Sequence, residues 1–351
     1  MFKMLSGMLG MDVGIDLGSS NIVVYVKDKG IVLSEPSAVA VKRLPKGQGF
    51  EVIAVGHDAK AMSGKVPAGI DAIWPLEGGV IANFDMTQEL IRYCIRRVSA
   101  SNTFMVHPRV VISIPAEVTE VERKAVIDAT LGAGASEAYV VEEPISAALG
   151  VGLPIEKPGG CMIIDIGGGT SEVSVISLGG IVVTSSLRTA GKMMDNAIIA
   201  MVRSRYALLI GETTAEEVKN TIGSALPLAE ELEMNVKGRD LSGGLPKSDT
   251  ISSIEVREAM EPIFTGIEDM VKVALEKMPP ELAKDVVDRG IVLTGGVALM
   301  RGFSERLSRA INTPVIAAEQ PLYSVALGVG KILDNIENVR RTLQPTSQGS
   351  R

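Results

Sequence analysis

The chain has 351 residues, 46% of them hydrophobic and 22% charged, which suffices for two domains with sizeable cores. Its net charge of −7 and its 3% of aromatic residues argue against a nucleic-acid-binding protein, which needs a basic face and stacking platforms. Two cysteines without a CxxC spacing give neither a disulfide framework nor a metal site, and two histidines make a histidine-based catalytic dyad a poor prediction.

The N-terminal stretch MFKMLSGML is predicted to form a short amphipathic helix on a membrane surface. Its apolar residues recur on one face at helical spacing, at Met1, Phe2, Met4, Leu5, Met8 and Leu9. One such segment binds weakly, so firm attachment needs many copies on a filament. A disordered start or a segment docked on the core is an equal alternative from the residues alone. No run reaches the roughly 20 apolar residues of a transmembrane helix.

Residues 12–33 are predicted to form a β-hairpin meander with tight turns. Asp16 ends an apolar run, Gly18, Ser19 and Ser20 form the first turn, and a second turn follows at 27–30.

An α/β passage follows, with a helix at 86–98, a strand at 109–115 and a strand at 138–144. Thr119 and Glu122 have the spacing of a capping box, which opens a helix that ends at Gly132. Between the first helix and strand, Phe104 and Met105 form an apolar loop tip, which indicates a second membrane contact unless the loop is buried.

Residues 160–186 repeat the pattern of residues 12–33. Asp165 ends an apolar run, glycines fill the turn at 167–169, and a second turn follows at Gly179. Two independent hairpins are the alternative, but the shared Ile-Asp-aliphatic-Gly sequence favours an internal duplication.

The rest of the chain is predicted to be mainly helical. Helices are expected at 193–210, 214–223, 255–277 and 324–333, a polar loop at 237–250, a strand at 290–296, and a disordered tail from Gln344.

The repeated pattern indicates a phosphate-binding site. An apolar strand delivers the carboxylate to a fixed point, and the glycines let backbone N–H groups approach an anion. Two such turns facing each other would hold a phosphate chain, and their carboxylates would require a divalent cation, reached directly or through its water ligands. The stretch LTGGVAL adds a strand, two glycines and a helix start, which suits phosphates or ribose, with a simple tight turn as the alternative.

The order of these motifs is similar to the actin, Hsp70 and sugar-kinase ATPase superfamily, and within it the chain resembles the MreB family of bacterial actins. The resemblance spans almost the whole chain and is carried by GIDLGSSN, KGIVLSEPSAVAV, VEEPISAALGVGLPI, IIDIGGGTSEVSVISLGGIV, LLIGETTAEEVKNTIG, PPELAKDVVDRGIVLTGG and VALGVGKIL.

The resemblance implies an α/β fold of the duplicated, two-lobed actin-like (ribonuclease H-like) kind, with the nucleotide in the cleft between the lobes. Lobe I would comprise residues 1–152, with a small subdomain at 34–76 and a C-terminal helix at about 320–343 returning to it. Lobe II would comprise residues 153–319, with a small subdomain at about 187–250.

The resemblance also implies the site residues. Asp16 and Asp165 would flank Mg²⁺, Glu143 would orient the attacking water, and Thr170 would assist it together with Asp165. The nucleotide (ATP or ADP) would contact two phosphate loops, an adenosine-side pair and a strand–glycine motif: Asp16, Gly18, Ser19, Ser20 and Asn21; Gly167, Gly168, Gly169 and Thr170; Glu216 and Lys219; and Gly295, Gly296, Val297 and Ala298.

The residues alone leave alternatives open for two of these roles. Glu143 read by itself is better explained as a helix N-cap carboxylate, and Glu142 beside it is a second candidate. Glu216 and Lys219 also fit a capping box with an i,i+3 ion pair.

Three positions depart from the family's pattern. Ile22 removes a hydroxyl from the first loop, Lys192 replaces an acid near the expected nucleotide, and Val297 replaces a glycine. These changes are expected to alter the rate of ATP hydrolysis without abolishing nucleotide binding.

The implied function is a slow ATPase of the cytoskeleton that polymerises and sets rod cell shape by organising cell-wall synthesis. The implied partners are further copies of the chain in paired antiparallel protofilaments, the inner face of the cell membrane, and membrane-anchored cell-wall elongation proteins such as RodZ, with no nucleic acid. A small-molecule kinase and a chaperone ATPase are the rivals; the first lacks a convincing set of substrate groups, and the second would need a further domain.

Overall fold

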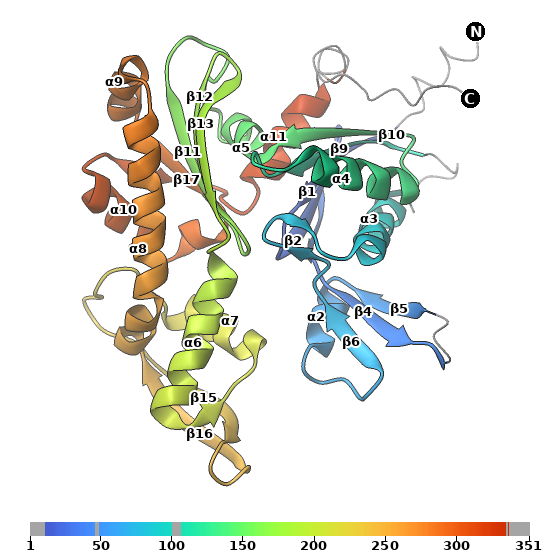
Figure 1. The fold of residues 1–351 in the computed structure, drawn as a ribbon, viewed down its shortest axis with the longest axis vertical. Coiled ribbons are helices and arrows are strands. Elements are labelled where there is room, and N and C mark those ends of the chain that lie inside the picture. The colour runs from blue at the N-terminus through green and yellow to red at the C-terminus, as the bar shows by residue number, and fades with distance from the viewer. Residues whose placement is uncertain (1–10, 46–48, 100–106, 335, 337–351) are drawn as a thin grey trace. The chain divides into compact units, whose positions relative to one another are not determined.

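The computed structural model describes residues 11–45, 49–99, 107–334 and 336 (Figure 1). The chain divides into two compact units. Unit 1 comprises Met1–Pro154 and Tyr323–Arg351, and unit 2 comprises Ile155–Leu322. Each unit has an α/β fold with its own central sheet.

The central sheet of unit 1 has the strand order β10-β9-β1-β2-β3. β1 pairs antiparallel with β2 and parallel with β9, β2 pairs antiparallel with β3, and β9 is parallel with β10. Apolar side chains on β1 and β2 are buried because helices cover the sheet. The strands are β1 (Asp12–Leu17), β2 (Asn21–Val26), β3 (Gly30–Pro36), β9 (Arg109–Ile114) and β10 (Glu137–Glu142).

The helices of unit 1 are α3 (Phe84–Ser99), α4 (Glu120–Gly132), α5 (Glu143–Gly150) and α11 (Ser324–Asp334). The predicted capping box is confirmed, because the side chains of Thr119 and Glu122 cap α4 reciprocally, and α4 ends at Gly132. α11 packs tightly on α5: a Cβ on Gly328 would collide with the backbone of Ser146, so glycine permits this close approach.

A smaller antiparallel sheet follows β3, with the order β5-β4-β6. Its elements are β4 (Val39–Arg43), β5 (Phe50–Val55), α2 (His57–Met62) and β6 (Ile70–Ile73), and two short strands, β7 (Leu76–Glu77) and β8 (Val80–Ile81), come after it.

The central sheet of unit 2 has the same topology, with the order β13-β12-β11-β17-β18. Its middle strand β11 is antiparallel to β12 and parallel to β17, as β1 is to β2 and β9. Both sheets even share a register irregularity between their second and third strands, at Val24/Tyr25 and at Val175/Ile176. The strands are β11 (Cys161–Ile166), β12 (Ser171–Ser177), β13 (Gly180–Leu187), β17 (Ile291–Thr294) and β18 (Val315–Ala317). The predicted duplication is therefore a duplication of sheet topology.

The helices of unit 2 are α6 (Gly191–Tyr206), α7 (Glu212–Ile222), α8 (Ser253–Lys277), α9 (Pro280–Arg289) and α10 (Phe303–Ile311), with a 3₁₀ turn η2 (Gly296–Leu299). The predicted helix at 193–210 runs too far, because Ala207 adopts φ 51° and ends α6.

The predicted polar loop at 237–250 is wrong. β15 (Glu233–Asp240) and β16 (Pro246–Ser252) pair there, and β14 (Leu208–Leu209) adds a third strand. Val236 and Ile251 are the buried residues of these two strands, while the remaining positions are partly or fully exposed. Polar residues therefore fill most of this hairpin, which hides the alternation that marks a strand.

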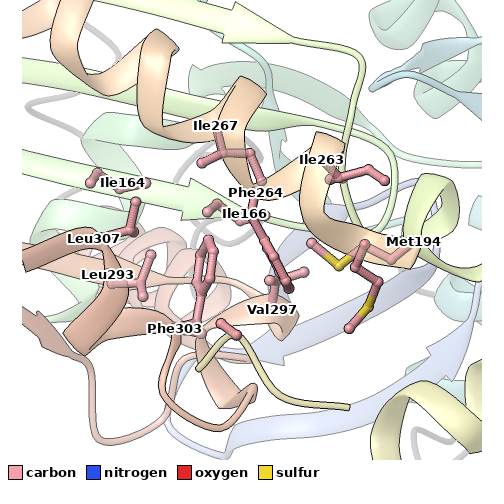
Figure 2. Packing of buried hydrophobic residues seen from close by; sticks show 14 of the residues in the cluster. Ile164, Ile166, Met194, Ile263, Phe264, Ile267, Leu293, Val297, Phe303 and Leu307 are labelled. Carbon is pink, nitrogen blue, oxygen red and sulfur yellow. The ribbon is translucent and has the colours of Figure 1, made fainter. Parts of the chain in front are cut away.

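The core of unit 2 lies between its sheet and the helices α8 and α10 (Figure 2). The rings of Phe264 and Phe303 stand 5.6 Å apart at their centroids, and Ile166 and Val297 pack into the same cluster. Ile166 ends β11 and Val297 follows β17, so the core supports the sheet edge at which both strands end.

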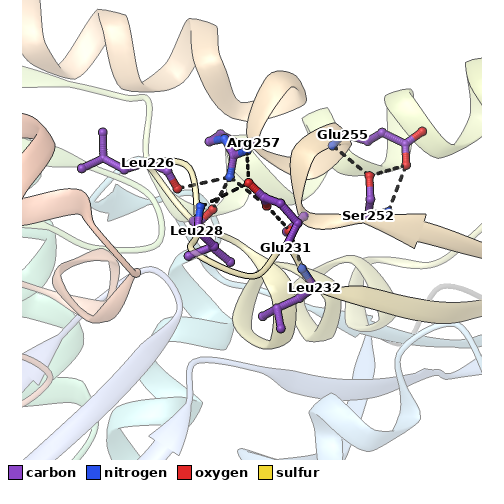
Figure 3. A network of polar contacts seen from close by, with 9 residues as sticks. Leu226, Leu228, Glu231, Leu232, Ser252, Glu255 and Arg257 are labelled. Atoms are coloured by element: carbon purple, nitrogen blue, oxygen red, sulfur yellow. Dashed lines mark hydrogen bonds and ion pairs between the residues drawn. The ribbon is translucent and has the colours of Figure 1, made fainter.

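The side chain of Arg257 holds the connection between α7 and β15 (Figure 3). Arg257 of α8 donates to the carbonyl of Leu226, to Ser224 Oγ and to Glu231. The bonds from Arg257 and from Ser253 hold the pKa of Glu231 low, at about 2. Arg301 donates to the Gly223 carbonyl at 3.2 Å and pairs with Ser224 in an isolated β-bridge, so arginines and one bridge hold this segment.

Candidate functional site

The first glycine-rich turn of unit 1 connects β1 and β2. A Cβ on Gly18 would lie 2.7 Å from the Asn21 carbonyl oxygen, so the turn requires glycine. Ser37 holds the turn twice: its Oγ donates to the Gly18 carbonyl at 2.6 Å, and its backbone N–H donates to the Ser20 carbonyl at 2.9 Å. The turn is therefore fixed by a neighbouring strand end before any ligand binds.

The hydroxyl of Ser19, which was expected to bind phosphate, instead contacts another part of unit 1. Its side chain is buried, with 6% of the residue exposed, and its Oγ accepts the backbone N–H of Gly79 at 2.9 Å. A ligand at this turn would therefore meet backbone groups, Ser20 and the exposed Asn21.

Carboxylates gather where the parallel strands of unit 1 end. Asp16 lies near the end of β1, and the Ser113 hydroxyl of β9 donates to its Oδ1 at 3.3 Å. Glu142 ends β10 opposite Ile114 of β9, and Glu143 begins α5. Since β1, β9 and β10 are parallel, these three carboxylates lie at one edge of the sheet.

The two glutamates at the start of α5 have different surroundings. Glu142 is the N-cap residue but makes no side-chain cap bond, and its Oε1 lies 3.6 Å from Arg123. Glu143 occupies the first helical position, followed by Pro144, where the helix dipole favours a carboxylate. The position of Glu143 in the first turn of α5, at the sheet edge where Asp16 lies, makes it a candidate for orienting a water molecule.

The glycine-rich turn of unit 2 is held by a helix. The N–H of Gly167 donates to the Thr170 carbonyl at 2.9 Å and closes the turn. The carbonyls of Gly167 and Gly168 accept the N–H groups of Gly191 and Lys192, at 3.1 and 2.8 Å. These two residues begin α6, so the turn rests on the N-terminus of that helix.

Asp165 lies at the end of β11, paired in register with Thr294 of β17. Gly295 follows with φ 83°, and a Cβ there would overlap the Ile166 carbonyl and lie 2.5 Å from Asp165 Oδ1. Burial raises the pKa of the Asp165 carboxyl to about 6.

The environment of Asp165 fits a metal ion that arrives with its ligand. A cation beside a buried carboxyl stabilises its charged form. Among the described residues there is no group of three or more histidine, cysteine or acidic side chains that could hold a metal ion. Mg²⁺ commonly binds through one or two carboxylates plus phosphate oxygens, so Asp16 and Asp165 suit it as partial ligand sets.

Val297 and Ala298 face the core. They are 5% and 7% exposed, and Val297 packs near Phe303 (Figure 2). The accessible part of this motif is therefore the backbone of Gly295 and Gly296.

Glu216 and Lys219 lie on α7, whose N-cap is Gly211 without a side-chain cap bond, so the capping-box interpretation is wrong. Lys219 Nζ lies 2.8 Å from Asp195 Oδ1 and donates to the Gly191 carbonyl at 3.1 Å. Asp195 was not predicted. Helical spacing alone does not indicate that it meets a lysine from another helix.

The predicted membrane contacts Phe2, Met4, Leu5, Met8, Leu9, Phe104 and Met105 lie outside the described residues. Within the described part of the chain, none of the helices is long and apolar enough to span a membrane.

Comparison with known proteins places this arrangement in a family. The family model described as MreB/Mbl protein matches residues 10–341. The chain belongs to the MreB/Mbl family. Members similar to it include the cell shape-determining protein MreB of Escherichia coli K12, 48% identical over 96% of this chain and 97% of that protein. The cell shape-determining protein Mbl of Bacillus subtilis is 42% identical over 95% of this chain and 98% of that protein.

Solved structures agree with the MreB/Mbl assignment. MreB5 of Spiroplasma citri bound to AMPPNP is 36% identical, with a TM-score of 0.87 over 95% of this chain and 99% of that one. The ADP-bound MreB5 has the same TM-score and 38% identity, over 94% and 99% of the two chains. The MamK double helical filament shares the fold. It is 22% identical, with a TM-score of 0.76 over 92% of this chain and 98% of that one. The fold is therefore the duplicated actin-like fold.

Proposed function

We propose that the chain is an actin-like cytoskeletal ATPase that binds Mg²⁺-ATP, hydrolyses it slowly and polymerises into filaments. The filaments lie on the inner face of the cell membrane and organise cell-wall synthesis to set rod cell shape. The curated relatives that support this proposal are named as cell shape-determining proteins, and MreB5 of Spiroplasma citri was solved with AMPPNP and with ADP.

One observation carries the nucleotide part of the proposal: the same Asp-aliphatic-Gly turn ends the central strand of both sheets. In each unit the carboxylate stands at a strand end, beside a turn held by hydrogen bonds to neighbouring residues. Such preformed turns suit polyphosphate, and we assign both turns to the same nucleotide.

The chemistry requires positioning more than a covalent nucleophile. Backbone N–H groups of the two turns bind the phosphates, and Asp16 and Asp165 hold Mg²⁺ directly or through water. When bound, Mg²⁺ neutralises phosphate charge. Glu143 and Thr170 orient the attacking water. Glu216 and Lys219 contact the adenosine side, and the backbone of Gly295 and Gly296 lies beside the nucleotide.

The proposed partners follow from the family. They are further copies of the chain in paired antiparallel protofilaments, the membrane surface, and membrane-anchored elongation proteins such as RodZ. The N-terminal residues Phe2, Met4, Leu5, Met8 and Leu9 and the loop residues Phe104 and Met105 form the proposed membrane contact.

Sedimentation with nucleotide tests the function. Purified protein is expected to pellet as filaments with Mg²⁺-ATP and to release phosphate slowly. Glu143→Ala should slow phosphate release while nucleotide still binds, and Glu142→Ala, the matched control, should change it little. A protein that stays monomeric with every nucleotide and lipid would overturn the proposal.

Co-pelleting with liposomes tests the membrane contact. Deletion of residues 1–10 removes the predicted amphipathic helix, so binding to anionic vesicles should weaken. Unchanged binding would remove that segment from the membrane contact.

A further inference from the structure

The ammonium group of Lys219 connects two helices of unit 2. It donates to the Gly191 carbonyl, which belongs to α6, and forms an ion pair with Asp195, one turn further along α6. Both side chains are 13% exposed, so water screens this pair only weakly. Removal of one partner would take this ion pair away from a largely buried charge.

Gly191 is the point at which this pair reaches the glycine-rich turn. Its N–H donates to the Gly167 carbonyl, and its own carbonyl accepts Lys219. A Cβ on Gly191 would stand 3.3 Å from the Gly167 oxygen, 3.4 Å from Lys219 Nζ and 3.5 Å from Gly168 Cα. The turn, the start of α6 and Lys219 are therefore packed around one residue.

These contacts fix the direction of the donors in the turn. In a trans peptide the C=O of one residue and the N–H of the next point in opposite directions. The carbonyls of Gly167 and Gly168 point at the N-terminus of α6, where they accept N–H groups. The N–H groups of Gly168 and Gly169 must therefore point away from α6, and we assign them to an incoming anion.

We propose that Asp195 and Lys219 are positioning residues for the phosphate-binding turn at 167–170. Asp195 fixes the ammonium of Lys219, Lys219 holds the first carbonyl of α6, and α6 orients the N–H groups of the turn. This inference rests on the proposed nucleotide binding and adds an action on the phosphates to the expected contact of Lys219 with adenosine.

Nucleotide affinities of full-length variants test the inference. Lys219→Met and Asp195→Asn are each expected to weaken the binding of ADP and ATP with Mg²⁺ about tenfold, as for loss of a charge-assisted hydrogen bond. In Asp195→Asn, which keeps Lys219, adenosine affinity measured by competition against a fluorescent ADP analogue should change less than twofold. The double variant should bind no worse than Lys219→Met alone, because Asp195 acts through Lys219.

Two further variants keep the test independent of folding. Lys219→Arg retains the cation and the ion pair, so its ADP affinity should stay within about threefold of that of the wild type. Lys284→Met on α9 removes an equal charge at an exposed position and should leave ADP affinity unchanged.

Four results would overturn the inference. Equal losses for adenosine and ADP in Asp195→Asn would place its effect on the adenosine side, and additive losses in the double variant would separate Asp195 from Lys219. Unchanged ADP affinity in both single variants, with normal binding by the wild type, would refute the positioning role alone. A wild type that binds none of the three ligands would refute the proposed function and this inference together.

Discussion

The two glycine-rich turns have the same sequence pattern and the same place in their sheets, yet they are held by different means. In unit 1, two side-chain hydroxyl groups hold the turn. The Ser37 hydroxyl donates to the Gly18 carbonyl, and the Ser19 hydroxyl accepts the Gly79 N–H. In unit 2, backbone groups at the start of α6 bond the carbonyls of Gly167 and Gly168. Duplication therefore preserved the strand and the turn, while each copy acquired its own support.

The two aspartates differ in the same way. Both residues are partly exposed. Asp16 accepts the Ser113 hydroxyl, whereas Asp165 lies beside Gly295, and desolvation of its carboxyl raises its pKa to about 6. The unit 2 carboxylate is thus costly to keep charged without a cation. Four predictions test the comparison of the two turns.

The largest effect is expected at Gly295. Its backbone (φ 83°, ψ 170°) is a region available essentially to glycine alone, and a Cβ would overlap the Ile166 carbonyl. Gly295→Ala should lower the free energy of unfolding by at least about 3 kcal/mol. Gly244→Ala, also at positive φ but with open space around the new methyl, should cost about 1 kcal/mol. Urea denaturation measures both, and equal costs would show that the contact with Asp165 and Ile166 is unimportant.

Asp165→Asn is expected to stabilise the metal-free protein. A folded-state pKa above the unfolded value means that the native state binds the proton more tightly, so this group's contribution to stability falls as pH rises from about 4 through 6. At pH 7.5 the substitution should raise the free energy of unfolding by about 1–3 kcal/mol, and the gain should shrink at pH 5.

Asp16→Asn is the matched control for this second prediction. Because Asp16 accepts the Ser113 hydroxyl, its amide variant should bring no gain in stability. Unfolding in EDTA at both pH values measures the two variants. A gain at Asp16 equal to that at Asp165 would remove the electrostatic difference between the turns.

Ser19→Ala should cost about 1 kcal/mol in the nucleotide-free protein, because the Gly79 N–H loses its acceptor in a buried place. Ser20→Ala, one residue further along the same turn, should change stability by less than about 0.5 kcal/mol. Thermal unfolding compares them. If Ser20→Ala proved the more costly, the side-chain support of this turn would lie elsewhere.

The smallest effect concerns the helix that supports the unit 2 turn. Lys192 lies in the first turn of α6, which contains no acidic residue, and a cation there opposes the helix dipole. Lys192→Glu should therefore stabilise the nucleotide-free protein by about 0.5 kcal/mol. Lys284→Glu, within α9, should have a smaller effect. Differential scanning calorimetry can resolve the pair, and a loss of stability in Lys192→Glu would contradict the prediction.

The sequence by itself determined the parts of the fold that depend on local periodicity. The two meanders, the capping box at Thr119 and the strand that runs into α5 follow from alternation and spacing that need no distant partner. The β15–β16 hairpin was missed because it buries little beyond Val236 and Ile251. The sheet topologies then showed that the repeat extends beyond the turns to strands that carry no shared motif.

Only the tertiary structure decided what supports each turn. The partners of Ser19, Lys219 and Asp165 lie 60, 28 and 130 residues away in the chain, at Gly79, Gly191 and Gly295. Spacing in the sequence reports which face of a helix or strand a residue occupies, but not which distant backbone group meets it. The motif thus predicted where phosphates would bind, while packing set the desolvation of the Asp165 carboxyl and the orientation of the peptide groups around it.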